Sequence, residues 1–237
     1  EKLKLMRLGT MAQLHRQHTT DNQFNDLTPD EYLALLVDHE YEERQNKKIN
    51  RLINQAKFKQ QATLSNIDFT HPRNLDKNMF NRLSTLDFIS KKENLIITGA
   101  SGVGKSYLAQ ALGHQACQMG KKVLYHNTAR FFKKLKLAKV DGTYLKELRL
   151  LLKTDLLILD DFGLQSFDNH AREALMDVID DRYNQTSTII ASQIPVSTWY
   201  DIIGEGTVAD AILDRIVNSS HRIDLKGDSL RKAILNP

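Results

Sequence analysis

Apolar residues follow two different spacings along the chain, and the change between them divides the sequence into two parts. Over the first 62 residues, positions such as Leu33, Leu36 and Val37 recur at the spacing of an amphipathic helix. From Asn94 onward, short apolar runs alternate with stretches of helical spacing. We therefore predict a helical domain over residues 1–62 and an α/β domain over residues 63–237, in which residues 63–93 form a transition.

The N-terminal part contains a clear helix start. Thr28 is placed to act as the N-cap, Pro29 fits the first turn, and Glu31 can close a capping box with Thr28. No proline follows until Pro72, so a long helix is permitted. The spacing also predicts a separate amphipathic helix over residues 3–14.

Five short apolar runs in the second part have the composition of strands, and a helical stretch over residues 172–183 lies between two of them. Alternation of this kind predicts a parallel five-stranded sheet covered by helices. The runs are Leu95–Thr98, Lys122–His126, Leu156–Asp160, Thr188–Ala191 and His221–Leu225.

Residues 99–106 read Gly-Ala-Ser-Gly-Val-Gly-Lys-Ser, which is a complete phosphate-binding loop pattern. The glycines allow backbone N–H groups to point at phosphate oxygens, Lys105 can reach the β- and γ-phosphates, and the Ser106 hydroxyl can ligate Mg²⁺. The expected nucleotide-binding residues are Gly99, Ala100, Ser101, Gly102, Val103, Gly104, Lys105, Ser106 and Tyr107.

The context of the loop matters, because a short pattern also occurs by chance. The loop follows an apolar β-branched run and opens a helical pattern that continues to Gly120, as a phosphate loop requires. A glycine-rich turn with an accidental lysine is the alternative, and it does not account for strand, loop and helix in this order.

Asp160 and Asp161 end the apolar run that begins at Leu156. Ligands bind at the carboxyl ends of parallel strands, so we assign Asp160 to Mg²⁺ and Asp161 to activation of the attacking water. The alternative is a surface turn, Asp-Asp-Phe-Gly, without chemistry.

Together these motifs make the chain resemble the AAA+ ATPases, and within them the IstB-like transposition helper ATPases and the related DnaC-type helicase loaders. The resemblance extends from about residue 64 to the C-terminus. It is carried by residues 99–106, 157–163, 190–195, 211–215 and 221–231.

The resemblance implies further roles in ATP hydrolysis. Either Ser192 or Gln193 would sense the γ-phosphate, and the sequence leaves the choice open. Arg215 matches the arginine finger that reaches the nucleotide of a neighbouring subunit, and Arg231 matches the second sensor arginine. Many AAA+ proteins have Glu where Asp161 stands and Asn or Asp at the sensor position, and both departures put the hydrolysis rate in doubt.

Basic residues cluster in two segments, although the net charge is only +4. Residues 130–139 contain five basic residues and no acid, and residues 44–59 contain six after an acidic stretch. Such stripes are often only solvated helix faces. The resemblance to the DnaC-type and initiator-like AAA+ proteins implies that residues 130–139 bind DNA phosphates, and residues 44–59 are assigned to a second DNA surface or to a partner contact. The candidate DNA contacts are Arg130, Lys133, Lys134, Lys136, Lys139, Lys47, Lys48 and Arg51, whereas Phe131 and Phe132 are expected in the core.

The composition is that of a folded protein, with 41% hydrophobic and 26% charged residues in 237. No apolar stretch approaches the length of a membrane span, and no signal peptide is visible. Cys117 is the single cysteine, expected to be a buried structural thiol, and it fits a reducing cytoplasm.

Together with the motifs, the resemblance implies an ATP- and Mg²⁺-dependent ATPase that binds double-stranded DNA, assembles with ATP into a homo-oligomeric ring or helix, and serves the transposase of the same mobile element. A DnaC-type helicase loader is the main alternative, since the same core serves both. A small-molecule kinase is a third, against which the basic segments and residues 211–215 speak.

Overall fold

The computed structural model of the chain describes residues 1–21 and 27–230, which belong to two compact units, Glu1–Arg51 and Leu52–Pro237. The boundary predicted from the sequence followed residue 62, whereas the second unit begins at Leu52. Leu52, Ala56 and Ala62 are buried in the core of this second unit, which accounts for the difference.

The first unit contains helices α1 (Lys2–Leu5), α2 (Gly9–Asp21) and most of α3 (Pro29–Ala56). The predicted capping box at the start of α3 is confirmed, because Glu31 Oε2 accepts hydrogen bonds from the Thr28 backbone N–H (2.8 Å) and hydroxyl (2.7 Å). The single helix predicted over residues 3–14 is wrong. Arg7 lies in the left-handed region between α1 and α2, and the Glu40 carboxylate accepts from N–H groups in the first turn of α2.

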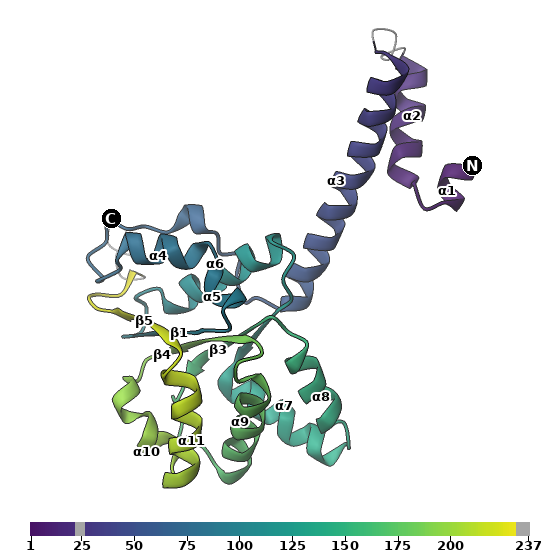
Figure 1. Ribbon diagram of the computed structural model, residues 1–237. Coiled ribbons are helices and arrows are strands. Elements are labelled where there is room, and N and C mark those ends of the chain that lie inside the picture. Colours follow the sequence, from purple (N-terminus) through teal and green to yellow (C-terminus); the bar gives the residue numbers. More distant parts are fainter. Residues whose placement is uncertain (22–26, 231–237) are drawn as a thin grey trace. The chain divides into compact units, whose positions relative to one another are not determined.

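The second unit is built on the predicted five-stranded parallel sheet (Figure 1). Its order is β2-β3-β4-β1-β5, so β1 lies between β4 and β5. The bounds are β1 (Asn94–Gly99), β2 (Val123–Asn127), β3 (Leu156–Phe162), β4 (Ser187–Ser192) and β5 (Ser220–Leu225).

Apolar side chains on both faces of the sheet form two cores. Alternate residues of a strand point to opposite faces, so on β1 Leu95 and Ile97 join one core and Ile96 joins the other. On β3, Ile158 faces the first core and Leu159 the second. Burial on both faces explains why these strands read as continuous apolar runs.

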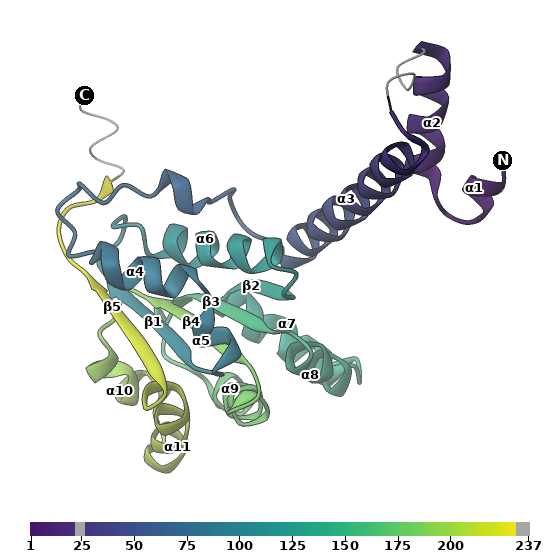
Figure 2. The same cartoon turned by 45° about the horizontal axis from the view of Figure 1, so that its top comes forward.

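Helices cover both faces of the sheet, as Figures 1 and 2 show. Helix α6 (Lys105–Gln118) lies on one face with α4 (Lys77–Ser84) and α5 (Asp87–Ser90). The opposite face carries α7 (Thr128–Val140), α8 (Tyr144–Leu152), α9 (Asn169–Arg182), α10 (Trp199–Ile203) and α11 (Gly206–Val217). The 3₁₀ turn η2 (Val196–Thr198) precedes α10.

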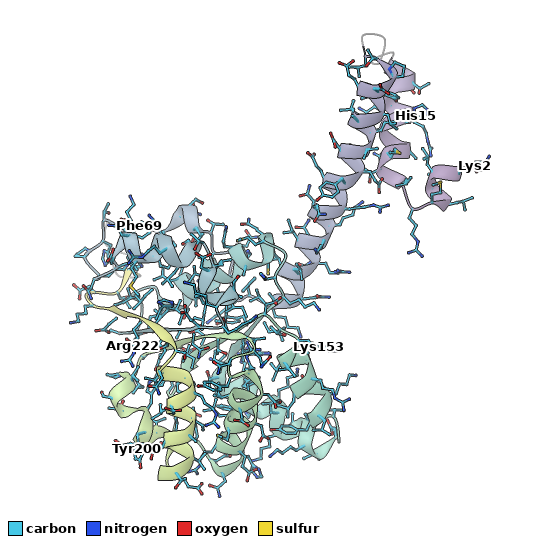
Figure 3. The ribbon with its side chains drawn as sticks, viewed as in Figure 1. Lys2, His15, Phe69, Lys153, Tyr200 and Arg222 are labelled. Carbon is cyan, nitrogen blue, oxygen red and sulfur yellow. The ribbon has the colours of Figure 1, made fainter. Side chains whose placement is uncertain are left out.

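The transition segment before β1 is more ordered than the sequence indicated. It contains the 3₁₀ turn η1 (Leu64–Asn66) as well as α4 and α5. Asp76 caps α4 by accepting from the N–H groups of Asn78 and Met79. Phe69, which Figure 3 labels, lies in this segment, and its ring packs edge-on against that of Phe80 on α4. This segment therefore belongs to the wall of the α/β unit.

Two sequence expectations about buried residues are confirmed. Cys117 is fully buried on α6, and burial raises the pKa of its thiol to about 12. Phe131 and Phe132 of α7 lie in the second core, at 1% and 9% exposure. Across residues 1–21 and 27–230, none of the helices is both long and apolar enough to span a membrane.

Candidate nucleotide-binding site

The phosphate loop connects the carboxyl end of β1 to the amino end of α6, as the motif requires. Gly104 is the N-cap of α6 and has a φ of 101°, a conformation that disfavours any residue with a side chain. A Cβ added there would also lie 2.4 Å from Nη1 of Arg73. Glycine at this position therefore allows both the turn and the close approach of a neighbouring chain segment.

Residues to which the sequence analysis assigned no role form hydrogen bonds with the backbone of the loop. Arg73 is 3% exposed, and its guanidinium donates to the backbone carbonyls of Val103 (3.1 Å) and Asp68 (2.7 Å). Burial lowers the pKa of Arg73, and Asp68 opposes that shift. On the other side, the Leu230 N–H donates to the Gly102 carbonyl at 3.0 Å. Motif spacing gives no signal for contacts of this kind.

Lys105 is buried in the loop at 6% exposure. Its ammonium group donates to the Ala100 carbonyl at 2.7 Å, across the loop. The charge therefore lies within the ring of backbone that would surround a phosphate.

Ser106 and Asp160, which are 54 residues apart, are joined directly by the fold. The Ser106 hydroxyl donates to Asp160 Oδ1 at 2.8 Å, and Asp160 is 3% exposed. A hydroxyl beside a buried carboxylate is a set of hard oxygen donors of the type that Mg²⁺ takes, together with waters and substrate phosphates. The residues present therefore fit the metal that the sequence predicted.

The remaining contacts of Asp160 come from β2, α7 and the next residue along the chain. The Tyr125 hydroxyl donates to Asp160 Oδ2 at 2.6 Å, and the Asp161 N–H donates to Oδ1 at 3.0 Å. The buried Thr128 hydroxyl donates to the Asp160 carbonyl at 2.8 Å. Burial, followed by the hydrogen bond to Asp160, raises the pKa of Tyr125, which keeps this hydroxyl protonated as a donor.

Asp161 lies at an irregularity of β3. The pairing with β4 is shifted between Leu159 and Phe162, and Asp161 has a φ of 56°. Its Oδ2 accepts a hydrogen bond from Nδ2 of Asn127 at 2.9 Å. Asn127 is also the N-cap of α7, through its Oδ1 and the Arg130 N–H. One side chain thus joins Asp161 to the basic helix.

The two sensor candidates differ in their environment. The Ser192 hydroxyl is fully buried, donates to the Phe162 carbonyl at 2.7 Å and accepts from the Ile194 N–H at 3.0 Å. Gln193 is half-buried at the carboxyl end of β4. The Ser192 hydroxyl is therefore already hydrogen-bonded to two backbone groups of the same chain.

Arg215 lies in the last turn of α11 and contacts its own subunit. Its Nε lies 2.9 Å from Asp180 Oδ1 without hydrogen-bond alignment, its Nη1 donates to the Ala211 carbonyl, and its guanidinium lies 5.8 Å from the centroid of the Tyr183 ring. The structure thus places Arg215 against α9. Arg231 lies outside the described residues.

The basic residues of α7 are exposed, but most of them are already paired. Lys134 pairs with Glu147, Lys136 with Asp168 at 3.7 Å, and Lys139 with Glu173 at 2.9 Å. Within the described ranges, Lys133 and Arg130 have no carboxylate at ion-pair distance. In the first unit, Lys47 lies 3.6 Å from Glu43, and Lys48 and Arg51 are exposed on α3.

A groove lies between α7 and the loop that follows β3. Its lining includes Arg130, Lys133 and Lys136 on one side and residues 163–168 on the other, and it also includes Asp161. The basic helix and the second acidic residue of the nucleotide site therefore share one surface, which the sequence did not reveal.

The family model and the similar proteins agree on one protein family. The sequence matches the family described as IstB-like ATP binding protein over residues 1–235. The insertion-sequence ATP-binding protein y4pL of Sinorhizobium fredii (strain NBRC 101917 / NGR234) is 44% identical over 232 residues, which cover 98% of this chain and 95% of that protein. The ATP-binding protein of insertion sequence IS1162 from Pseudomonas fluorescens is 42% identical over 198 residues, covering 83% of this chain and 86% of that protein.

Solved structures show the same fold at lower identity. The DnaC helicase loader matches with a TM-score of 0.56 and 24% identity, over 70% of this chain and 97% of that one. AMPPCP-bound DnaA from Aquifex aeolicus matches with a TM-score of 0.60 and 20% identity, over 76% of this chain and 54% of that one. These similarities establish the predicted AAA+ fold. Because the family match spans nearly the whole sequence, the chain belongs to the family of IstB-like ATP-binding proteins.

Proposed function

We propose that this protein is a Mg²⁺-dependent ATPase that assembles on double-stranded DNA with ATP and serves the transposase of its own mobile element. The observation that carries the ATPase part is the contact between Ser106 and Asp160 beside a complete phosphate loop. The link to transposition rests on relatives named as insertion-sequence proteins along nearly their full length.

We assign a residue of this chain to each step of hydrolysis. Ser106 and Asp160 would hold Mg²⁺, which would neutralise charge on the phosphates of ATP. Lys105 binds the β- and γ-phosphates. Asp161 orients the attacking water and accepts its proton, while Asn127 fixes one of its carboxylate oxygens.

The γ-phosphate sensor is assigned to Gln193. Since the Ser192 hydroxyl already donates to Phe162 and accepts from Ile194, its hydrogen-bonding capacity is largely used within the chain. Gln193 keeps an amide that can donate to a phosphate oxygen. Arg215 and Arg231 keep the roles that the family resemblance implies, Arg215 toward the neighbouring subunit and Arg231 within its own.

DNA binding is assigned to the basic face of α7, which shares the groove with Asp161. Lysine contacts to phosphates are independent of sequence and sensitive to salt. A duplex on this face would lie close to Asn127, and through it to Asp161. This arrangement supports a regulator whose ATPase activity responds to DNA.

The test is phosphate release from Mg-ATP, with and without duplex DNA. We expect hydrolysis that increases with protein concentration and with duplex DNA, and a fall of about 10²-fold or more in Lys105→Ala, since Lys105 faces developing phosphate charge. Absence of hydrolysis under all these conditions would contradict the ATPase assignment. Preference for single strands, with co-purification of a replicative helicase, would favour the helicase loader instead.

A further inference from the structure

The carboxylate of Asp160 has both of its oxygens engaged by protein donors. Oδ1 accepts from the Ser106 hydroxyl and the Asp161 N–H, and Oδ2 accepts from the Tyr125 hydroxyl at 2.6 Å. The first two contacts belong to the phosphate loop and to the strand that carries Asp160. The third comes from a different strand and is made by a residue without a place in the nucleotide-binding motifs.

The position of Tyr125 follows from the register of the sheet. On β2, Asn127 pairs with Asp160 and Tyr125 pairs with Ile158, two residues before Asp160 on the neighbouring strand β3. Its ring is 7% exposed and packs in the same core as Leu108 and Ala109 of α6. The core fixes the ring, and the ring in turn fixes where the hydroxyl points.

We propose that Tyr125 is a positioning residue for the metal-binding carboxylate: its hydroxyl holds Oδ2 of Asp160 and thereby keeps Oδ1 directed toward Ser106. This inference rests on the proposed use of Mg-ATP. In this role Tyr125 acts through Asp160, the residue to which its hydroxyl donates.

The physical argument concerns orientation. A carboxylate rotates readily about its last side-chain bond, and a donor hydrogen-bonded to the oxygen that does not face the metal removes that freedom before the metal binds. A hydrogen bond to an ionised carboxylate is stronger than one between neutral groups. Replacing Tyr125 by Phe retains the ring in the core and removes only this donor.

The experiment measures binding of a fluorescent methylanthraniloyl-ATP across a range of free Mg²⁺ concentrations and in EDTA. In Tyr125→Phe we expect half-maximal enhancement of nucleotide binding by Mg²⁺ to need about 10–100-fold more Mg²⁺, the usual effect of removing a hydrogen-bond partner of a metal-binding residue. Affinity in EDTA should stay close to that of the unaltered protein. A residue that only stabilised the fold would change both affinities together.

Tyr144→Phe provides a matched control. The Tyr144 hydroxyl donates to Asp177 Oδ2 at the same distance, 2.6 Å, between α8 and α9 and away from the phosphate loop. Its loss should leave the Mg²⁺ dependence unchanged. Thermal unfolding of both variants checks that each is folded.

Asp160→Asn separates failure of this inference from failure of the proposed function. If the unaltered protein shows no Mg²⁺ dependence of nucleotide binding, the Mg-ATP function itself is refuted. In a second case, Asp160→Asn loses that dependence while Tyr125→Phe keeps half-maximal enhancement at the same Mg²⁺ concentration as the unaltered protein. That result overturns only the role of Tyr125. An equal loss of affinity in Tyr125→Phe with Mg²⁺ and in EDTA would overturn it as well.

Discussion

Single residues at the end of β2 connect the sheet to the nucleotide site. Tyr125 and Asn127 point to one face, toward Asp160 and Asp161, while His126 packs on the other against Phe131. Strand alternation explains this division. It makes β2 a supporting strand for the site, although it carries none of the nucleotide-binding motifs.

His126 gives the folded state a pH dependence that can be measured. Burial, with the nearby charges of Lys134 and Lys57, lowers the pKa of His126 from 6.5 to about 4, and Glu147 opposes this shift only weakly. The unfolded chain therefore binds more protons than the folded one between these values, so stability is retained above pH 6.5 and lost as pH falls toward 4.

We expect a contribution from His126 on the order of 1–3 kcal/mol across this range. Urea unfolding of the unaltered protein and of His126→Gln at several pH values measures it. The difference in unfolding free energy between the two proteins should shift in favour of His126→Gln as the pH falls. Parallel pH profiles would show that His126 does not titrate in this window.

At the scale of elements, α7 has two faces of different character. Its apolar face, with Phe131 and Leu135, completes the second core, and its other face carries the lysines. Salt bridges hold three of these lysines to carboxylates of α8, α9 and the N-cap of α9. An exposed ion pair contributes little stability. A paired lysine must nevertheless leave its carboxylate before it can bind a phosphate.

This difference in pairing predicts that Lys133 and Lys139 contribute differently to the salt dependence of duplex binding. Lys133→Ala should weaken duplex binding and reduce the slope of log affinity against log salt by about 1, because an unpaired charge is lost. Lys139→Ala removes the same charge from the same helix, but its loss also leaves Glu173 unpaired. Its effect on the salt slope should therefore differ from that of Lys133→Ala.

Duplex binding by fluorescence anisotropy at several salt concentrations provides the measurement. Binding unchanged in Lys133→Ala at every salt concentration would exclude this face of α7 from the DNA interface. Loss of affinity without a change in slope would indicate damage to the helix rather than loss of a phosphate contact.

At the scale of the whole molecule, Arg215 raises the question of assembly. Within one subunit it contacts Asp180 and Tyr183, so reaching a neighbouring nucleotide requires it to leave these partners. Beside these partners the Arg215 side chain is 28% exposed.

Mixing two inactive variants tests whether the site is shared. Lys105→Ala retains Arg215, and Arg215→Ala retains Lys105, so a head-to-tail assembly of both restores some complete sites. Random mixing in equal amounts should recover about a quarter of the interfaces. Phosphate release by the mixture measures this, and no recovery at any ratio would refute the assignment in trans.

The sequence by itself determined the local features. The capping box at Thr28, the five strands, the phosphate loop and Asp160 all depend on residues within one element or one turn, where spacing and side-chain type decide the structure. The prediction of one helix over residues 3–14 was wrong because a distant residue contributes to the structure there. Glu40, about 30 residues away, accepts hydrogen bonds from the start of α2 and interrupts that pattern.

Only the tertiary structure decided which groups meet at the site. Tyr125 reaches Asp160 across 35 residues, and Arg73 reaches the phosphate loop across 30. Such contacts depend on strand order and register, which are set by burial of both sheet faces at once and leave no local pattern in the sequence. The sequence therefore identified the candidate nucleotide-binding residues, while the fold identified the residues that contact them from other elements.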